Sequence, residues 1–176
     1  MMNINQKQTV YYGKITCENH FIYIAATNKG LCYVGSPNEG VNELNHWINK
    51  KQFIPTLIED KEKIKPYTMQ LQDYLSGKRK SFDVPIDVKG TPFQEAVWNE
   101  LKNIPYGKTV SYTDIANSIG NPTAVRAVGA AVGANPVLIV IPCHRVIAKN
   151  GRLTGFRGGI SMKEKLLALE NSTKVN

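Results

Sequence analysis

Residues 133–147, with the sequence GANPVLIVIPCHRVI, contain three side chains that could do chemistry together. Cys143, His144 and Arg145 follow one another directly after Pro142. A thiol has a reference pKa of about 8.5 and attacks as the thiolate, so a nucleophilic cysteine needs a base or a positive charge beside it. His144 could supply the base and Arg145 the charge. These side chains can cooperate only if the backbone turns here, which the fixed φ of Pro142 favours.

The alternative for Cys143 alone is a small buried hydrophobic residue without a chemical role. The run Val-Leu-Ile-Val-Ile at 137–141 precedes it and is too short for a membrane span. Its β-branched residues predict a buried strand that ends at Cys143. A rigid strand below a proline turn would hold the thiol in place, which favours a functional site.

The composition describes a soluble globular chain with an unusual charge. Of its 176 residues 42% are hydrophobic and 20% are charged, which suits one compact domain or two small ones. The formal net charge is +8. Such a surface attracts polyanions, with nucleic acid ahead of an acidic membrane surface, although a basic balance can also serve solubility alone.

The three cysteines, Cys17, Cys32 and Cys143, have no regular spacing. They predict neither a disulfide framework nor a zinc site and indicate a reducing compartment. Cys17, His20 and Cys32 resemble part of a metal site, but the fourth ligand is missing, so we expect no metal. No window has the character of a secretion signal or of a membrane span, and we therefore expect a cytoplasmic protein.

Residues 1–85 are predicted to form an α/β domain. Aromatic and β-branched runs at 10–16, 21–26 and 31–34 predict antiparallel strands joined by tight turns. Helices are expected over 41–50 and around 67–75, the second one ended by Gly77, and 82–86 could add a last strand. The basic run 78–80 is expected to be a solvated linker.

Residues 86–176 are predicted to be mostly helical. Thr91 with Gln94, and Ser111 with Asp114, have the spacing of capping boxes and predict two helix starts. The second helix is expected to end at Gly120, and after a turn a third helix runs over 123–134. Two short helices across a tight turn predict a helix-turn-helix. A last helix is expected over 161–170.

The third helix should have a buried and a smooth exposed face. Val125, Val128 and Val132 share the buried side, and Arg126, Ala127 and Ala130 lie on the other. One arginine on a face of small residues suits insertion into a nucleic-acid groove. The alternative is that the alanines pack against the N-terminal domain.

The motif PCHRV, preceded by SYTDIA and RAVGAAVGANP, resembles the DNA methyltransferases that repair O6-alkylguanine. The resemblance covers residues 91–170, and several motifs at fixed separations make it specific. It implies a small ribonuclease H-like α/β domain at 1–85 and a DNA-binding alkyltransferase domain at 86–176. It also implies a suicide reaction in which one alkyl group is transferred to Cys143, since a thioether is not hydrolysed back to a thiolate.

The same resemblance implies individual roles. Arg126 would replace a nucleotide flipped out through the minor groove, and Tyr112 would turn the phosphate and contact the flipped base. Cys143 would be activated through a water by His144, whose ring Glu170 holds, as in a Cys-His-acid triad. The further expected site residues are Asn135 as a hinge, Ala127, Ala130 and Arg145 at the DNA, and Val146, Phe156 and Arg157 at the base pocket. Lys149, Arg152, Lys163 and Lys165 are further candidates for phosphate contacts.

The sequence departs from some relatives at Phe156, where a tyrosine is common, and at Arg157, where a small hydroxyl residue can occur. We expect a monomer that acts on double-stranded DNA containing alkylated guanine and has no membrane partner. No glycine-rich nucleotide loop is present, so we also expect no cofactor and no S-adenosylmethionine. O4-alkylthymine is a further possible substrate. The alternatives are a non-catalytic alkyltransferase-like lesion-binding protein, a cysteine hydrolase and a transcription factor.

Overall fold

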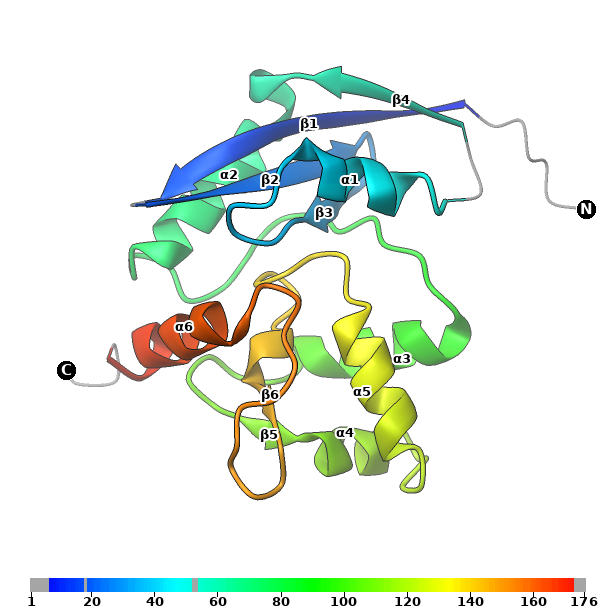
Figure 1. Cartoon of the computed structure of the whole chain (residues 1–176), viewed down its shortest axis with the longest axis vertical. Coiled ribbons are helices and arrows are strands. Elements are labelled where there is room, and N and C mark those ends of the chain that lie inside the picture. Colours follow the sequence, from blue (N-terminus) through cyan, green and yellow to red (C-terminus); the bar gives the residue numbers. More distant parts are fainter. Residues whose placement is uncertain (1–6, 18, 52–53, 173–176) are drawn as a thin grey trace, which may run out of the picture.

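The computed structural model describes residues 7–17, 19–51 and 54–172. Its N-terminal half is a four-stranded sheet in the order β3-β2-β1-β4 (Figure 1). Neighbours β1, β2 and β3 pair antiparallel, and β4 runs parallel to β1. The strands are β1 (Lys7–Cys17), β2 (His20–Thr27), β3 (Gly30–Val34) and β4 (Ile54–Glu59).

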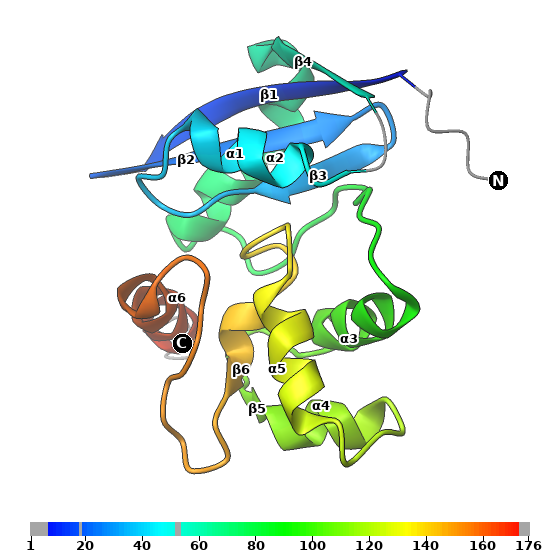
Figure 2. The same ribbon diagram turned by 45° about the vertical axis from the view of Figure 1, so that its right-hand side comes forward.

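One helix covers each face of this sheet, α1 (Val41–Ile48) on one side and α2 (Lys61–Leu75) on the other (Figures 1 and 2). Asp60 caps α2 by accepting hydrogen bonds from the backbone N–H groups of Glu62 and Lys63. The three predicted strands and both predicted helices are confirmed. β4 was not predicted, because its segment contains Pro55 and pairs with the first strand only through a long crossover.

The outer edge of β3, which is buried, joins the two halves of the molecule. The Val34 N–H donates to the Pro136 carbonyl at 2.9 Å, and the Leu31 N–H donates to the Pro85 carbonyl at 2.9 Å. Gly30 permits this approach, because a Cβ there would lie 2.5 Å from the Pro85 carbonyl oxygen. The strand expected over 82–86 is wrong: this segment forms one isolated bridge to Leu31, and its prolyl nitrogen cannot extend a ladder.

The C-terminal half is mostly helical, as predicted. Both capping boxes are confirmed, Thr91 with Gln94 at the start of α3 and Ser111 with Asp114 at the start of α4. Gly120, at φ 71°, follows the end of α4. The helices are α3 (Pro92–Lys102), α4 (Tyr112–Ser118), α5 (Val125–Gly133) and α6 (Ile160–Ser172), and the two-residue strands β5 (Val110–Ser111) and β6 (Val146–Ile147) pair in parallel. The strands β5 and β6 were not predicted.

The apolar run 137–141 is buried as expected, but the prediction of a strand there is wrong. Ile139 has a left-handed φ of 73°, and the Ile141 N–H folds back to the Val137 carbonyl at 3.1 Å. Asn135 stabilises this turn, since its amide nitrogen donates to the Ile141 carbonyl at 2.9 Å and its amide oxygen accepts from the Val137 N–H. The local side-chain bonds therefore compete with an extended conformation.

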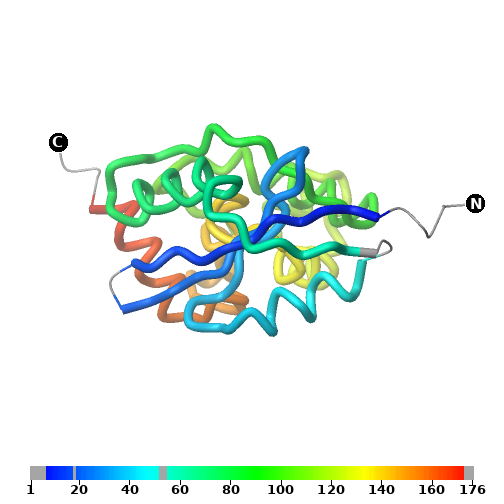
Figure 3. Tube along the Cα trace, turned by 90° about the horizontal axis from the view of Figure 1, so that it is seen from above, coloured from blue at the N-terminus to red at the C-terminus, as the bar shows by residue number. Residues whose placement is uncertain are grey.

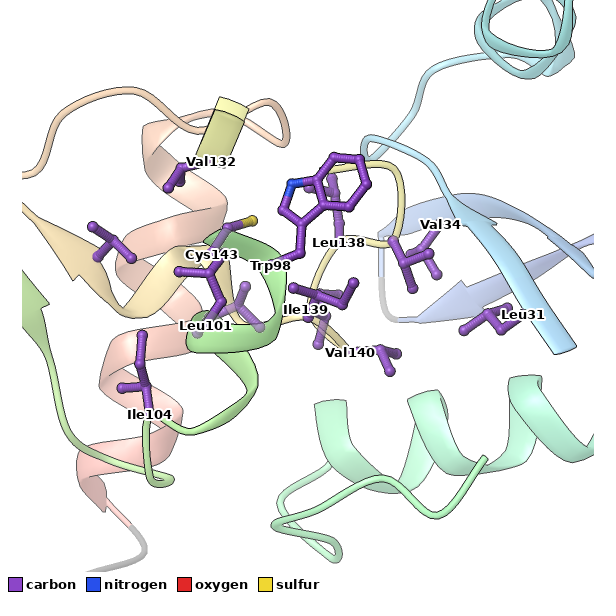
Figure 4. Packing of buried hydrophobic residues seen from close by; sticks show 14 of the residues in the cluster. Leu31, Val34, Trp98, Leu101, Ile104, Val132, Leu138, Ile139, Val140 and Cys143 are labelled. Carbon is purple, nitrogen blue, oxygen red and sulfur yellow. The ribbon is translucent and has the colours of Figure 1, made fainter. Parts of the chain in front are cut away.

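A single apolar cluster runs through both halves. It contains Leu31 and Val34 of the sheet together with Trp98, Leu101 and Cys143 of the helical half (Figure 4). A second, smaller cluster lies between α1 and the sheet. Seen from above, β1 crosses the full width of the helical half (Figure 3). Among the described residues no helix is both long and apolar enough to cross a membrane.

Candidate functional site

Cys143, His144 and Arg145 form one 3-10 turn, so the backbone does turn where the sequence requires it. Cys143 is 3% exposed, and its N–H donates to the Ile141 carbonyl at 2.8 Å. The side-chain amide of Asn135 donates to the Cys143 sulfur at 3.2 Å. Asn135 lies two residues beyond the end of α5. It therefore connects the second helix of the helix-turn-helix to the cysteine turn.

His144 and Glu170 form a fully buried pair. The His144 Nε2 atom lies 2.7 Å from Glu170 Oε1, and both side chains are 0% exposed. The other ring nitrogen of His144, Nδ1, is buried and has no hydrogen-bond partner among the described residues. Burial lowers the pKa of His144, and it outweighs the carboxylate of Glu170, which acts in the opposite direction. The imidazole is therefore neutral near pH 7 and can accept a proton at Nδ1.

Glu170 stays ionised because several donors surround it. Burial by itself would raise its pKa, but hydrogen bonds from His144, Arg145 and Tyr74 outweigh burial and lower the pKa to about 2. The backbone N–H of Gly107 also donates to Glu170 Oε2 at 2.7 Å. The carboxylate thus fixes the Nε2 side of His144.

Arg145 is not at the surface, so the expected contact to a DNA phosphate is wrong for this side chain. Arg145 is 7% exposed. Its Nε donates to both oxygens of Glu170 at 3.1 Å, and its Nη1 donates to the Ile104 carbonyl at 2.6 Å. The guanidinium compensates the buried carboxylate, and its donors are used inside the protein. The guanidinium therefore serves Glu170, whereas the sequence suggested it as the charge that activates the thiol.

Lys163 is a second basic residue that we expected at a DNA phosphate but that the structure buries in the protein interior. It is 0% exposed, and its Nζ donates to the carbonyls of Val146 at 2.6 Å and Thr154 at 2.9 Å. Burial lowers the pKa of Lys163. Lys149, Arg152 and Lys165 are exposed and remain available to a polyanion.

The thiol of Cys143 is protonated in this conformation. Burial raises its pKa, and the hydrogen bond from Asn135 and the charges of Arg157 and Lys163 offset this only in part. The sulfur is also closed off from solvent in this conformation, although the resemblance implies a base pocket there. Two surface hollows of about 100 and 110 Å³ lie elsewhere, one beside His20 and Lys165 and the other beside Trp98 and Lys102.

The segment 148–159 carries the groups that close the site. The Tyr112 hydroxyl donates to the Thr154 carbonyl at 3.1 Å. The half-buried Phe156 ring stands edge-on to the His144 ring at 6.4 Å between centroids. Val146, expected at the base pocket, is 0% exposed below this segment.

Arg157 holds the segment 148–159 to the N-terminal half. Its Nη1 donates to Glu43 at 3.0 Å, and its Nη2 donates to the Val34 carbonyl at 2.8 Å. The Ser36 hydroxyl donates to the Arg157 carbonyl at 3.1 Å. The side chain of Arg157 therefore forms hydrogen bonds with groups that a small hydroxyl residue at this position could not reach.

The faces of α5 are as predicted, except that Val125 is only half-buried. Val128 and Val132 are buried, and Arg126, Ala127 and Ala130 are exposed. Trp98 supports the helix from behind, because its indole N–H donates to the Ala131 carbonyl at 2.8 Å. Tyr112 lies against the same helix: a Cβ at Gly129 would be 3.9 Å from its ring. The exposed face is thus small, smooth and next to a tyrosine.

Sequence reasoning missed Tyr74 and the buried position of Lys163. Tyr74 lies on α2, and its hydroxyl donates to Glu170 Oε1. A signal for Lys163 exists, since Lys163, Leu166 and Glu170 follow a spacing of i, i+3 and i+7 that puts them on one helix face. For Tyr74 the helical pattern predicted burial, but it could not identify Glu170, which is 96 residues away, as the partner.

Together these features define a two-part α/β protein in which a helix-turn-helix is joined to a buried Cys-His-Glu arrangement. Two family models match the chain: the 6-O-methylguanine DNA methyltransferase ribonuclease-like domain over residues 10–88 and the DNA-binding domain of the same name over residues 92–172. The expected fold class is thereby confirmed.

Named relatives cover nearly the whole chain. It is 56% identical over 164 residues to the inducible methylated-DNA–protein-cysteine methyltransferase of Bacillus subtilis, covering 93% of this chain and 92% of the relative. A second relative from Methanosarcina acetivorans is 46% identical over 145 residues, covering 81% of this chain and 93% of its own. The crystal structure of Mycobacterium tuberculosis OGT in complex with DNA superimposes with a TM-score of 0.76 at 38% identity, covering 92% and 93% of the two chains. The chain belongs to the methylated-DNA–protein-cysteine methyltransferase family.

Proposed function

We propose that this protein repairs DNA by transferring a methyl or larger alkyl group from O6-alkylguanine in duplex DNA to Cys143, once per molecule. The observation that carries the proposal is the turn that places Cys143 beside His144, whose Nδ1 is buried without a partner while Nε2 is held by Glu170. A buried base next to a thiol suits a nucleophile that is activated only when substrate arrives.

The transfer is an in-line displacement at the alkyl carbon. The bond from the Cys143 sulfur to carbon forms as the bond from carbon to guanine O6 breaks, and the electron pair leaves with O6. The thiol proton passes through a water to His144 Nδ1, and the departing guanine takes up one proton in turn. Since the methyl donor is DNA, the balanced reaction needs no S-adenosylmethionine.

The alkylated base has to leave the stack before its alkyl carbon can line up with a protein sulfur. We propose that α5 enters the minor groove, that Arg126 takes the place of the flipped nucleotide and that Ala127 and Ala130 allow the close approach. Tyr112 supports this, because it lies between α5 and the segment 148–159. When that segment moves, the Tyr112 hydroxyl exchanges the Thr154 carbonyl for the purine and stabilises the developing charge.

The test is a single-turnover assay with a duplex carrying one labelled O6-methylguanine. We expect a mass gain of one methyl group on the peptide that contains Cys143, at one equivalent per protein. Cys143→Ala should abolish the transfer and keep duplex binding, whereas Cys17→Ala, at a different cysteine in the sheet, should transfer normally. Label on a different residue, or more than one equivalent per protein, would refute the proposal. A non-catalytic lesion-binding protein is not favoured, since the cysteine and its buried base are both present.

A further inference from the structure

Tyr74 belongs to the N-terminal half but ends inside the Cys-His-Glu arrangement. It lies near the end of α2 and is 0% exposed. Its ring is held by Phe82, at 4.9 Å between centroids, and by Tyr106, at 5.9 Å. The hydroxyl donates to Glu170 Oε1 and lies 3.3 Å from His144 Nε2. Two ring contacts therefore fix a hydroxyl group against the acid and the base at once.

Tyr74 differs from the other donors to Glu170 in its origin. His144, Arg145 and Gly107 donate from the C-terminal half, whereas Tyr74 reaches the carboxylate from the sheet domain. An ionised carboxylate only accepts hydrogen bonds, and its orientation follows from where its donors stand. The position of α2 is thereby coupled to the orientation of Glu170.

The hydroxyl also restricts the tautomer of His144. The proton of the Tyr74 hydroxyl is directed at Glu170, so the two oxygens that face His144 Nε2 are both acceptors. Nε2 must then carry a hydrogen, because a lone pair there would face two other lone pairs. In the neutral ring this leaves the lone pair on Nδ1. Burial raises the pKa of Tyr74, and so does the hydrogen bond to Glu170, so the hydroxyl keeps its proton.

We propose that Tyr74 is a positioning residue through which the N-terminal half orients Glu170 and holds His144 in the tautomer that can take the proton of Cys143. The inference rests on the proposed function, in which Nδ1 receives that proton. It assigns the sheet domain a direct part in the reaction besides its support of the fold.

Tyr74→Phe removes one oxygen atom and keeps the ring, and Tyr67→Phe, on the same helix and half-buried, is the matched control. We expect Tyr74→Phe to bind the modified duplex normally but to transfer the methyl group about tenfold more slowly, as the loss of a hydrogen bond to a charged group would cause. Tyr67→Phe should transfer at the rate of the unchanged protein.

Nitrogen-15 NMR of the histidine rings gives a readout that a merely structural role would not move. The chain has three histidines, so His144 can be assigned with one variant, His144→Gln. We expect the hydrogen on Nε2 in the unchanged protein and in Tyr67→Phe. In Tyr74→Phe Glu170 remains as an acceptor at Nε2, so we expect Nε2–H to stay the main tautomer with a small, measurable population that has the hydrogen on Nδ1. Folded and unfolded molecules give separate histidine signals, so the spectrum stays informative if Tyr74→Phe is less stable.

The outcomes separate the two proposals. If the unchanged protein transfers no methyl group, the proposed function fails whatever Tyr74→Phe does. If the unchanged protein transfers and Tyr74→Phe matches it in rate and in tautomer, the positioning role of Tyr74 is refuted and the proposed function stands.

Discussion

Glu170 is the residue that links the site to the stability of the protein. Its folded pKa of about 2 lies below its ordinary value of 4.5, so its ionised form stabilises the folded state at pH 4.5 and above. This contribution should be lost as the pH falls from 4.5 towards 2. The buried neutral His144 acts in a different window, since its lowered pKa costs stability from about pH 6.5 downwards.

Urea unfolding at a series of pH values would check this. We expect the free energy of unfolding to fall steeply below pH 4.5 in the unchanged protein and less steeply in Glu170→Gln, which has no carboxylate to protonate. Glu164→Gln, at an exposed position on the same helix, should keep the steep fall. An identical slope in Glu170→Gln and the unchanged protein would contradict the argument.

Lys163 is a structural cation. It donates to the carbonyls of Val146 and Thr154 from a fully buried position. Lys163→Met keeps an unbranched side chain of nearly the same length but removes the ammonium donor from both carbonyls, which we expect to lower the free energy of unfolding by about 1–3 kcal/mol. Lys165→Met, on the exposed side of the same helix, should change it little. Denaturant titration measures both, and equal effects would show that burial of Lys163 is not what matters.

Among the elements, α5 is where the proposed DNA contact can be tested most simply. Arg126 is exposed on the face that also carries Ala127 and Ala130, and nothing in the buried core depends on it. If Arg126 fills the space of the flipped nucleotide, Arg126→Ala should slow transfer from duplex DNA much more than transfer from the free modified base. Lys102→Ala, exposed at the end of α3, is the control. An equal slowing with both substrates would show that Arg126 does not act by filling the space of the flipped nucleotide.

In the proposed reaction the segment 148–159 moves to admit a base, and Arg157 connects this segment to the sheet domain. Glu43 pairs with Arg157 and also accepts from Ser36, and these hydrogen bonds outweigh burial and lower the pKa of Glu43. Glu43→Gln should weaken this attachment. We therefore expect iodoacetamide to alkylate Cys143 faster in Glu43→Gln than in the unchanged protein or in the exposed control Glu39→Gln, measured by mass spectrometry. Unchanged alkylation would show that another contact keeps the segment closed.

The elements that the sequence predicts well are those whose signals are local. Thr91 with Gln94 and Ser111 with Asp114 marked two helix starts, because a capping box is complete within four residues. The turn at Ile139 could not be predicted, since β-branched residues favour a strand and a side chain outside the run, Asn135, decides against it.

The site was predictable to a similar extent. The resemblance implied that Glu170 holds the ring of His144, and the structure does bring these two residues together. The buried position of Arg145 depends on Ile104 and Glu170, which are distant in sequence, so a count of basic residues suggested a surface contact instead. The closed state of the site also depends on contacts between distant residues, since Arg157 of the C-terminal half bonds to Glu43 of the N-terminal half.

At the scale of the whole molecule, the continuous apolar cluster makes the two halves one cooperative unit. Residues such as Leu31 and Trp98 belong to the same cluster, and backbone hydrogen bonds from β3 cross between the halves. Neither half can lose its structure without exposing apolar surface of the other. We therefore expect one unfolding transition for the whole chain.

The two tryptophans allow a direct test, because Trp47 lies on α1 and Trp98 lies on α3. In Trp98→Phe fluorescence reports on the N-terminal half, and in Trp47→Phe it reports on the C-terminal half. In urea, the fluorescence transition of each variant should coincide with its own circular dichroism transition, even though Trp98→Phe loses the bond to Ala131 and unfolds at lower urea. A fluorescence midpoint that departs from the circular dichroism midpoint in either variant would show that the halves unfold separately. The interface between the halves could then open without global unfolding, and the coupling of the sheet domain to Glu170 through Tyr74 would depend on that interface being closed.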